Sequence, residues 1–272
     1  MSKLIKLKEV ASLVRDHDMV GIGGNVLHRS PNALLTELVK DQKKGLRLVK
    51  TAGAYDVDLL VRAGCVASVD AGFISYETEF GLAKYYRKAV EAGQVKANEH
   101  ACYTVMCALN AAKINSPFMP VYGLQISDLV ETNDYFKSVV DPFTGQEIHV
   151  VKALKPDVAL MHVHACDEMG NAYIEGPRYD DVLMAKASDK VILSTERILP
   201  TAQLKMKFER LALSGVLVDY VVHVPKGAYP CSCSKLYDVD KKRINEFLTL
   251  EDDAAFERYI KEVSLRYEGG RR

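Results

Sequence analysis

The chain has 272 residues, and its 36 lysines and arginines balance its 36 aspartates and glutamates. At this length, a hydrophobic fraction of 48% supplies a core for one large domain or two small ones. A neutral chain without a basic block lacks the electrostatic surface of a nucleic-acid-binding protein. No apolar run reaches the roughly 18 residues that span a bilayer, and the N-terminal segment becomes charged too early for a secretory signal. We therefore expect a cytoplasmic protein with no membrane or nucleic-acid partner, whose cysteines are reduced thiols.

Helical and extended patterns alternate from the N-terminus onward. The expected elements of the first half are helices at 6–16, 33–41, 56–63, 82–93 and 100–113 and strands at 18–22, 46–51 and 66–73. Those of the second half are strands at 157–165, 190–195 and 218–225 and helices at 180–188 and 250–265. At the helix ends, we expect Ser30 to be an N-cap with Pro31 in the first turn, Asp56 to cap the next helix and Gly64 to end it.

The alternation predicts an α/β fold with an open, mostly parallel sheet and helices on both faces, as one domain over residues 1–272. Residues 123–148 contain the turn signal DPFTG but no clear period, so we expect a long loop excursion there. Ligands of such sheets lie beyond the carboxyl ends of the strands. The site is therefore expected in the loops that follow Ile22, Thr51, Phe73 and His164.

Two adjacent glycines, Gly23 and Gly24, follow the strand at 18–22 in the segment MVGIGGNVLHRSPNALL. Glycines let the backbone approach a ligand and point N–H groups at it, although a tight turn explains them too. The spacing is not GxGxxG, and no acidic residue closes the next strand at Lys50 and Thr51. A dinucleotide-binding fold is therefore not expected.

This loop resembles the signature of the family I coenzyme A transferases, in particular of their α-type subunits. The resemblance rests on Asp16, the apolar strand, Gly23–Gly24 and then Arg29 before x-Pro. The general pattern has Phe and a third Gly where this chain has Asn25 and Arg29, and the Arg is similar to the glutaconate CoA-transferase branch. Further segments resemble that branch in the same order: YYRKAVEAG, PFMPV, VDPFTGQE, DVALMHVHACDEMGN, YDDVLMAKAS and VDYVVHVPKGAYPCSCSKLYDVD.

The resemblance implies a three-layer fold shared with sugar-phosphate isomerases. It also implies transfer of coenzyme A from an acyl-CoA thioester to a small, in some cases dicarboxylic, acid. In such enzymes a glutamate carboxylate attacks the thioester, and a glutamyl-CoA thioester forms before the incoming acid reverses both steps. The resemblance places that glutamate on a β-type partner, so this chain would hold no catalytic residue of its own. It implies a heterodimer or heterotetramer, with coenzyme A as substrate and no permanently bound cofactor.

Several residues are candidates for contacts with the substrate or coenzyme A: Gly23, Gly24, Asn25, Arg29, Ser75 and Glu77. Arg29 suits a bidentate carboxylate or phosphate contact, but it could equally clamp a loop or the partner. Ser75, Tyr76, Glu77 and Glu79 follow a strand end, where they could reach the pocket or belong to a solvated loop. His28 is a candidate by its position in the loop.

Relatives of the glutaconate branch include hydrolases that open a carbon ring in a CoA thioester during steroid breakdown. The resemblance implies that an acidic residue of their α-type chain acts, which places either Glu99 or Cys102 at that position here. Glu99 could instead be a first-turn acid of the helix at 100–113. A non-catalytic, phosphate-binding member of the same fold is a weaker alternative.

His162 and His164 share one strand face, with Asp167 and Glu168 beyond them, which superficially suggests a metal site. Alternation in a buried strand explains the two histidines without metal. Cys231 and Cys233 have no second cysteine pair and no histidine at zinc-like spacing. We therefore predict that the protein holds no metal ion.

Overall fold

The computed structural model describes residues 2–124, 127–207 and 211–268. Its main element is an eight-stranded sheet in which all registered strand pairs are parallel. The strands lie in the order β1 (Leu4–Ile5), β13 (Tyr220–His223), β12 (Val191–Thr195), β9 (Val158–Val163), β2 (Met19–Ile22), β3 (Leu46–Gly53), β4 (Val66–Ile74) and β5 (Lys96–Glu99).

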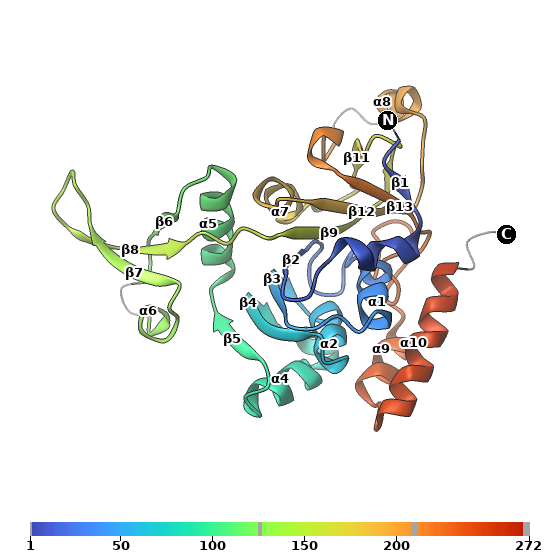
Figure 1. Ribbon diagram of the computed structural model, residues 1–272, viewed down its shortest axis with the longest axis horizontal. Coiled ribbons are helices and arrows are strands. Elements are labelled where there is room, and N and C mark those ends of the chain that lie inside the picture. The colour runs from blue at the N-terminus through green and yellow to red at the C-terminus, as the bar shows by residue number, and fades with distance from the viewer. Residues whose placement is uncertain (1, 125–126, 208–210, 269–272) are drawn as a thin grey trace.

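Helices cover both faces of this sheet (Figure 1). One face packs on η1 (Leu7–Leu13), α1 (Asn32–Lys40), α2 (Tyr55–Arg62), α4 (Lys84–Glu91), α9 (Lys241–Leu248) and α10 (Asp253–Glu268). The other face packs on α5 (Cys102–Lys113) and α7 (Asp181–Ala187). Neighbouring residues of one strand enter different clusters, as Leu48 and Val49 of β3 do. The predicted open parallel sheet with helices on both faces is confirmed.

The growth of the sheet changes side between β2 and β9. From β2 the chain adds β3, β4 and β5 on one side, and it later returns to add β9, β12 and β13 on the other. The segments that leave β2 and β9 therefore diverge at the carboxyl ends of two neighbouring parallel strands. This topological switch point is the place where open α/β sheets bind ligands.

A small antiparallel sheet stands where the sequence predicts a loop excursion over 123–148. Its elements are β6 (Phe118–Val121), α6 (Leu129–Thr132), β7 (Phe136–Val140) and β8 (Glu147–Lys152), with β8 as the central strand. It projects away from the main sheet (Figure 1). The turn at DPFTG is confirmed, because Asp141 N donates to Gln146 O at 2.8 Å. Only Phe136 of β7 is buried, so the segment carries no strand-like period. Residues 125–126 of the predicted excursion lie outside the described residues.

Two of the predicted helix boundaries need correction. Ser30 is not an N-cap, because its hydroxyl donates to Asp56 Oδ2 at 3.0 Å and caps no helix. Asp56 lies within α2, yet its carboxylate accepts the N–H of Ala54 at 2.9 Å and so serves the start of that helix. Gly64 follows α2 in the left-handed region at φ 68°, as the sequence predicts.

The edges of the sheet differ most from the prediction. Glu99 does not open a helix: it is the last residue of β5, and α5 begins at Cys102. Residues 96–99 read KANE, and a short polar edge strand of this kind carries no apolar signal. The two-residue strand β1 at the other edge was missed for the same reason.

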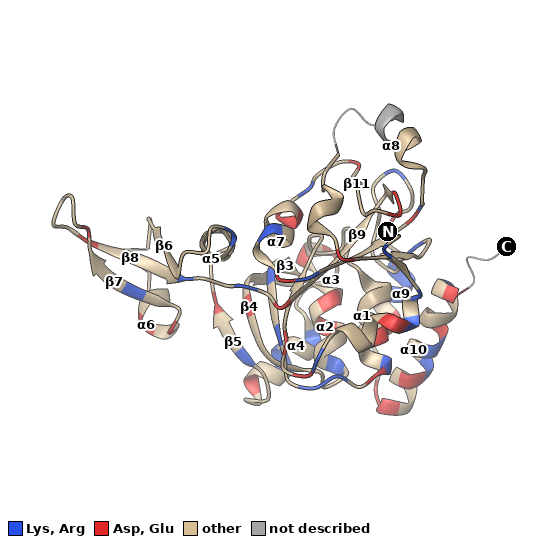
Figure 2. Ribbon diagram, turned by 45° about the horizontal axis from the view of Figure 1, so that its top comes forward, with Lys and Arg blue, Asp and Glu red and all other residues tan. Residues whose placement is uncertain are grey.

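Charges of both signs are interspersed over the surface helices, as α10 illustrates (Figure 2). This agrees with the neutral composition of 36 basic and 36 acidic residues. Among the described residues, none of the helices combines the length and the apolar character needed to cross a membrane.

One buried carboxylate, that of Asp58 in α2, holds the start of α4. Its Oδ1 accepts the N–H groups of Tyr85 and Tyr86 at 2.8 and 2.7 Å, and its Oδ2 accepts the hydroxyl of Tyr76 at 3.2 Å. Burial raises the pKa of the Asp58 carboxyl to about 6, although these hydrogen bonds oppose the rise. The interior therefore favours the protonated form.

We predict that Asp58→Asn flattens the dependence of the unfolding free energy on pH. The folded state keeps this proton up to about pH 6, whereas the unfolded chain releases it near the ordinary aspartate pKa of 3.8. Between these values the folded protein binds more protons, so this group's contribution to stability falls as the pH rises. Urea unfolding across this window measures the slope, and the exposed Glu251→Gln variant is the control. A slope in Asp58→Asn equal to that of the wild type would contradict the prediction.

Candidate functional site

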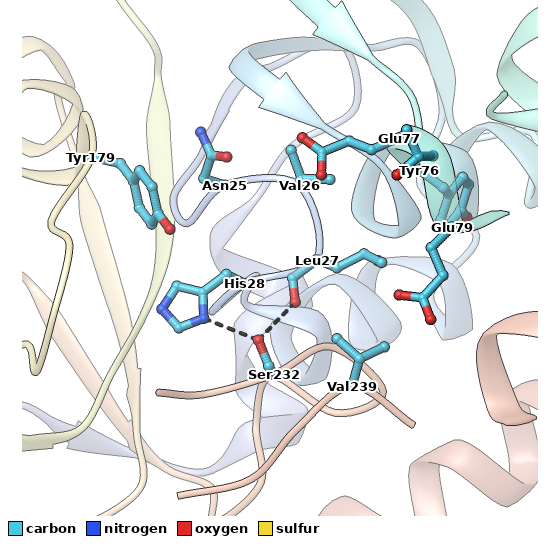
Figure 3. A pocket seen from close by; sticks show the side chains of 11 residues that line it. Asn25, Val26, Leu27, His28, Tyr76, Glu77, Glu79, Tyr179, Ser232 and Val239 are labelled. Atoms are coloured by element: carbon cyan, nitrogen blue, oxygen red, sulfur yellow. Dashed lines mark hydrogen bonds between the residues drawn. The ribbon is translucent and has the colours of Figure 1, made fainter. Parts of the chain in front are cut away.

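A cavity of about 440 Å³ opens at the carboxyl ends of the strands, beside the switch point. It is lined by residues 25–28 after β2, residues 76–79 after β4, Tyr179 after β9, and Ser232 and Val239 after β13 (Figure 3). These segments are distant in sequence. The cavity lies where the parallel sheet predicts a ligand site, and its size suits a small ligand or one part of a larger one.

The glycine loop has an unusual backbone beneath this cavity. Gly24 has φ 76°, and its Cβ would lie 2.6 Å from the carbonyl oxygens of His28 and Arg29, so only glycine fits. Asn25 and His28 exchange both backbone hydrogen bonds, at 2.9 and 2.8 Å, and form a tight loop.

The N–H groups of the two glycines point inward. Gly23 N donates to Leu160 O at 2.9 Å, and Gly24 N donates to Asp181 Oδ1 at 3.0 Å. Both donors are therefore used inside the protein, which differs from the expectation that they face a ligand.

Arg29 lies in the interior, with no exposed surface. Its guanidinium contacts both carboxylate oxygens of Asp181, at 3.1 and 2.7 Å, and also donates to the carbonyls of His162 and Pro177. Burial acts to lower the pKa of Arg29, but Asp181 outweighs it and the pKa is raised. Of the roles that the sequence leaves open for Arg29, this arrangement is the loop clamp, because the guanidinium is not free to bind a substrate.

A second buried ion pair, which sequence reasoning missed, supports the same loop. Lys50 Nζ lies 3.0 Å from Asp56 Oδ2 and donates to the carbonyls of Gly23 and Gly24 at 2.5 and 3.0 Å. Lys50 and Asp56 are both fully buried. A lysine inside the apolar strand at 46–51 was the available signal, since a buried lysine requires an acidic partner.

His28 presents a free nitrogen at the cavity. Its Nδ1 lies 3.0 Å from Ser232 Oγ, and that hydroxyl donates to Leu27 O at 3.1 Å, so Nδ1 holds the ring proton. Nε2 is buried and has no hydrogen-bond partner among the described residues. Burial and the neighbouring Arg29 lower the pKa of His28. The ring is therefore a neutral acceptor, with Tyr179 packed edge-on at 5.9 Å.

The predicted residues after β4 divide into two groups. Glu77 and Glu79 line the cavity, and Glu79 is paired with Lys241. Ser75 does not line it: its hydroxyl donates to Gly81 O at 2.9 Å and accepts the N–H of Glu77 at 3.1 Å. Ser75 therefore fixes the start of the Glu77 turn.

The other candidates lie away from the cavity. Glu99 is exposed at the edge strand β5, and Cys102 donates its thiol proton to Thr51 O at 3.3 Å. Asp167 organises the DEMGN turn by accepting the N–H groups of Met169 and Asn171. No lysine or arginine is among the residues described around the cavity. Its polar groups are therefore acceptors and carboxylates for the most part.

Comparison with known proteins gives a consistent picture. The sequence pattern of the coenzyme A transferase family matches residues 5–224. The A-type chain of glutaconate CoA-transferase from Acidaminococcus fermentans is 28% identical, over 93% of this chain and 83% of its own. The cholesterol ring-cleaving hydrolase IpdA subunit of Rhodococcus jostii is 31% identical, over 88% and 84%. An uncharacterized protein of Archaeoglobus fulgidus is 32% identical over 92% of this chain, which spans only 57% of that protein's length.

Two solved structures share the fold. The glutaconate coenzyme A-transferase of Acidaminococcus fermentans superimposes with a TM-score of 0.90 at 26% identity, covering 96% of this chain and 88% of that one. The decarboxylase AibA/AibB superimposes with a TM-score of 0.88 at 31% identity, covering 98% and 100%. Proteins with this architecture therefore carry names for transfer, hydrolysis and decarboxylation.

We predict that Asp181→Asn destabilises the protein by roughly 3–5 kcal/mol, because it leaves the guanidinium of Arg29 buried without a counter-charge. The matched control is Asp189→Asn, which removes a half-exposed pair with Lys155 and should cost about 1 kcal/mol or less. Denaturant unfolding of both variants measures the difference. Equal losses would show that the Arg29–Asp181 pair is not the support of the loop.

Proposed function

Because this chain belongs to the coenzyme A transferase family, we propose that it is the α subunit of an enzyme that moves coenzyme A from an acyl-CoA thioester to a short carboxylic acid. The observation that carries the proposal is the correspondence with the glutaconate enzyme over 96% of the chain. In this proposal residues 1–272 act as one domain, and the cavity beside the switch point receives the acyl group. Coenzyme A is a substrate, and no permanent cofactor takes part.

We assign the nucleophilic glutamate to a β-type partner, in a heterodimer or heterotetramer. The reaction needs a carboxylate that attacks the thioester and N–H donors that stabilise the oxyanion. In this chain Glu79 is held by Lys241, and the N–H groups of Gly23 and Gly24 are used internally. Relatives of this chain are named as one of two kinds of chain in their enzymes, which supports a second subunit.

Each candidate residue then has a distinct role. Asn25 and Glu77 contact the acyl group from the cavity wall. Gly23, Gly24 and Arg29 act from below by setting the shape of the loop that carries Asn25. Ser75 orients Glu77 through the N–H of that residue. The cavity needs both groups, because a change in the supporting residues would move the wall residues.

The first test is reconstitution with the β-type partner. The mixture of the two proteins should transfer coenzyme A from a thioester to free acids, whereas either protein by itself should be inactive. Borohydride should trap a glutamyl-CoA adduct on the partner after incubation with acyl-CoA. Full transferase activity from this chain alone would refute the assignment.

Hydrolysis of a ring-containing CoA thioester is the second candidate, since a ring-cleaving relative is 31% identical over 88% of the chain. It is favoured if the partner lacks the glutamate and no adduct is trapped. Glu99 would then be the acidic residue to test. Loss of hydrolysis in Glu99→Gln, with normal assembly, would establish this alternative over transfer.

We further predict that Glu77→Gln raises the use of dicarboxylic acids relative to monocarboxylic acids. The Glu77 carboxylate repels a second carboxylate in the cavity, and its removal should raise the ratio of kcat/KM values by roughly twofold to fivefold, the size of one partly exposed charge interaction. The control is Glu79→Gln, whose charge is already balanced by Lys241. Steady-state kinetics of the reconstituted enzyme with acids of equal chain length measure the ratio. An unchanged ratio in Glu77→Gln would place the acid elsewhere.

A further inference from the structure

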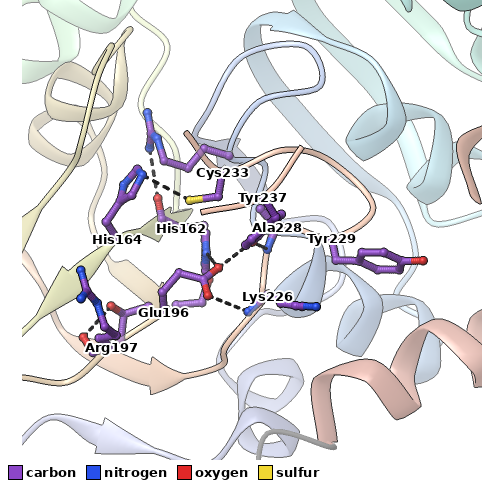
Figure 4. Close-up of polar contacts among 12 residues, drawn as sticks. His162, His164, Glu196, Arg197, Lys226, Ala228, Tyr229, Cys233 and Tyr237 are labelled. Atoms are coloured by element: carbon purple, nitrogen blue, oxygen red, sulfur yellow. Dashed lines mark hydrogen bonds and ion pairs between the residues drawn. The ribbon is translucent and has the colours of Figure 1, made fainter. Parts of the chain in front are cut away.

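A cluster of buried metal-ligating side chains lies outside the cavity, at the carboxyl ends of β9 and β12 and in the loop after β13. A nitrogen of His162, a carboxylate oxygen of Glu196 and the sulfur of Cys233 lie within 4.8 Å of one another (Figure 4). All three residues are buried. They come from three segments that the sheet brings together, so their convergence is not visible in the sequence.

The hydrogen bonds around His162 leave one nitrogen without a proton of its own. Nδ1 lies 2.8 Å from Ser194 Oγ, whose proton is donated to Met161 O, so Nδ1 is the donor and Nε2 carries a lone pair in the neutral ring. Nε2 lies 2.8 Å from Glu196 Oε1, and that oxygen already accepts the hydroxyl of Tyr237. Two lone pairs at this distance require a cation between them, either a proton or a metal ion.

The sulfur of Cys233 has surroundings that favour its charged form. His164 Nδ1 accepts the N–H of Glu175, so Nε2 carries the proton; it donates to Ser234 O at 2.9 Å and lies 3.4 Å from the sulfur. His164 is therefore a donor to the sulfur and not a ligand. Burial raises the pKa of the Cys233 thiol to about 12, and the charge of Arg29 opposes this rise.

We propose that His162 Nε2, Glu196 Oε1 and Cys233 Sγ bind a divalent transition-metal ion of the zinc class. Imidazole, carboxylate and thiolate together are the donor set that Zn²⁺ takes in proteins. The partners behind the ligands have the arrangement expected of metal sites: Ser194 fixes the tautomer of His162, and Lys226 N holds the other oxygen of Glu196 at 2.7 Å.

The charge balance of the interior permits this exchange. Without metal, the cluster holds one proton between His162 and Glu196 and one on the thiol of Cys233. A divalent ion replaces these two protons, so a neutral imidazole, a carboxylate and a thiolate surround two positive charges. The net charge of the cluster is unchanged, and no uncompensated charge is buried.

The bound ion would tie together the ends of β9 and β12 and the loop after β13. This loop also carries Ser232, which holds His28 at the cavity. Because the ligands converge only in the folded chain, the ion should stabilise the folded state over the unfolded one. The three-ligand site leaves one coordination position for water.

Cobalt is the probe that tests the proposal, since Co²⁺ replaces Zn²⁺ and gives a thiolate charge-transfer band. Titration of the reduced, chelator-treated full chain with CoCl₂ should produce this band with a stoichiometry of one ion, release about two protons per ion and raise Tm. Addition of ZnCl₂ should bleach the band by displacement.

Two variants separate this site from the other thiols. Cys233→Ser should abolish the band, and Cys231→Ser, which changes an equally buried thiol two positions away, should retain it. Circular dichroism establishes that each variant is folded. If the wild-type chain binds no Co²⁺ or Zn²⁺ at micromolar concentrations, the cation between His162 and Glu196 is a proton only and the proposal is refuted. A band that persists in folded Cys233→Ser would refute it equally.

Discussion

The buried ion pair of Arg29 with Asp181 is the interaction on which the site depends. Arg29 belongs to the loop after β2, and Asp181 opens α7, which the chain reaches only after β9. The pair therefore spans the switch point and closes it from below. Its desolvation cost is met by a bidentate contact and by two further carbonyls, so the loop has one low-energy position. The cavity above it is a consequence of that position.

The same constraint explains why the glycines matter without touching a ligand. A side chain on Gly23 would lie 2.5 Å from Asp181 Oδ1, which is the oxygen that also accepts from Gly24 N. The loop must approach this carboxylate closely, and only glycine permits the approach. The paired glycines thus preserve the ion pair. Their effect on the cavity is indirect, through the place at which the chain turns toward Asn25.

The sequence predicts the parts of the molecule that depend on local pattern. The apolar runs locate β2, β3, β4 and β9, because strands buried on both faces are apolar throughout. It does not predict β5 or β7, which are polar or exposed, nor the pairing of Lys50 with Asp56. The contacts of Arg29 were also beyond reach: its two roles differ only in the position of Asp181, 152 residues away. The residues that fix the site are thus long-range partners, whereas the residues that mark it, such as Gly23, are local.

The charge of the cavity bears on the division of labour between the two kinds of chain. Coenzyme A carries phosphates, and its thioester chemistry develops negative charge on oxygen, so both need cations or N–H donors. The described wall offers the carboxylates of Glu77 and Glu79 and the neutral ring of His28, while Arg29 and Lys50 are committed below the loop. Under the proposed function, this wall can shape and select an acyl group but cannot stabilise the reacting oxygens. A partner that brings the nucleophile must therefore bring the electrostatic stabilisation as well.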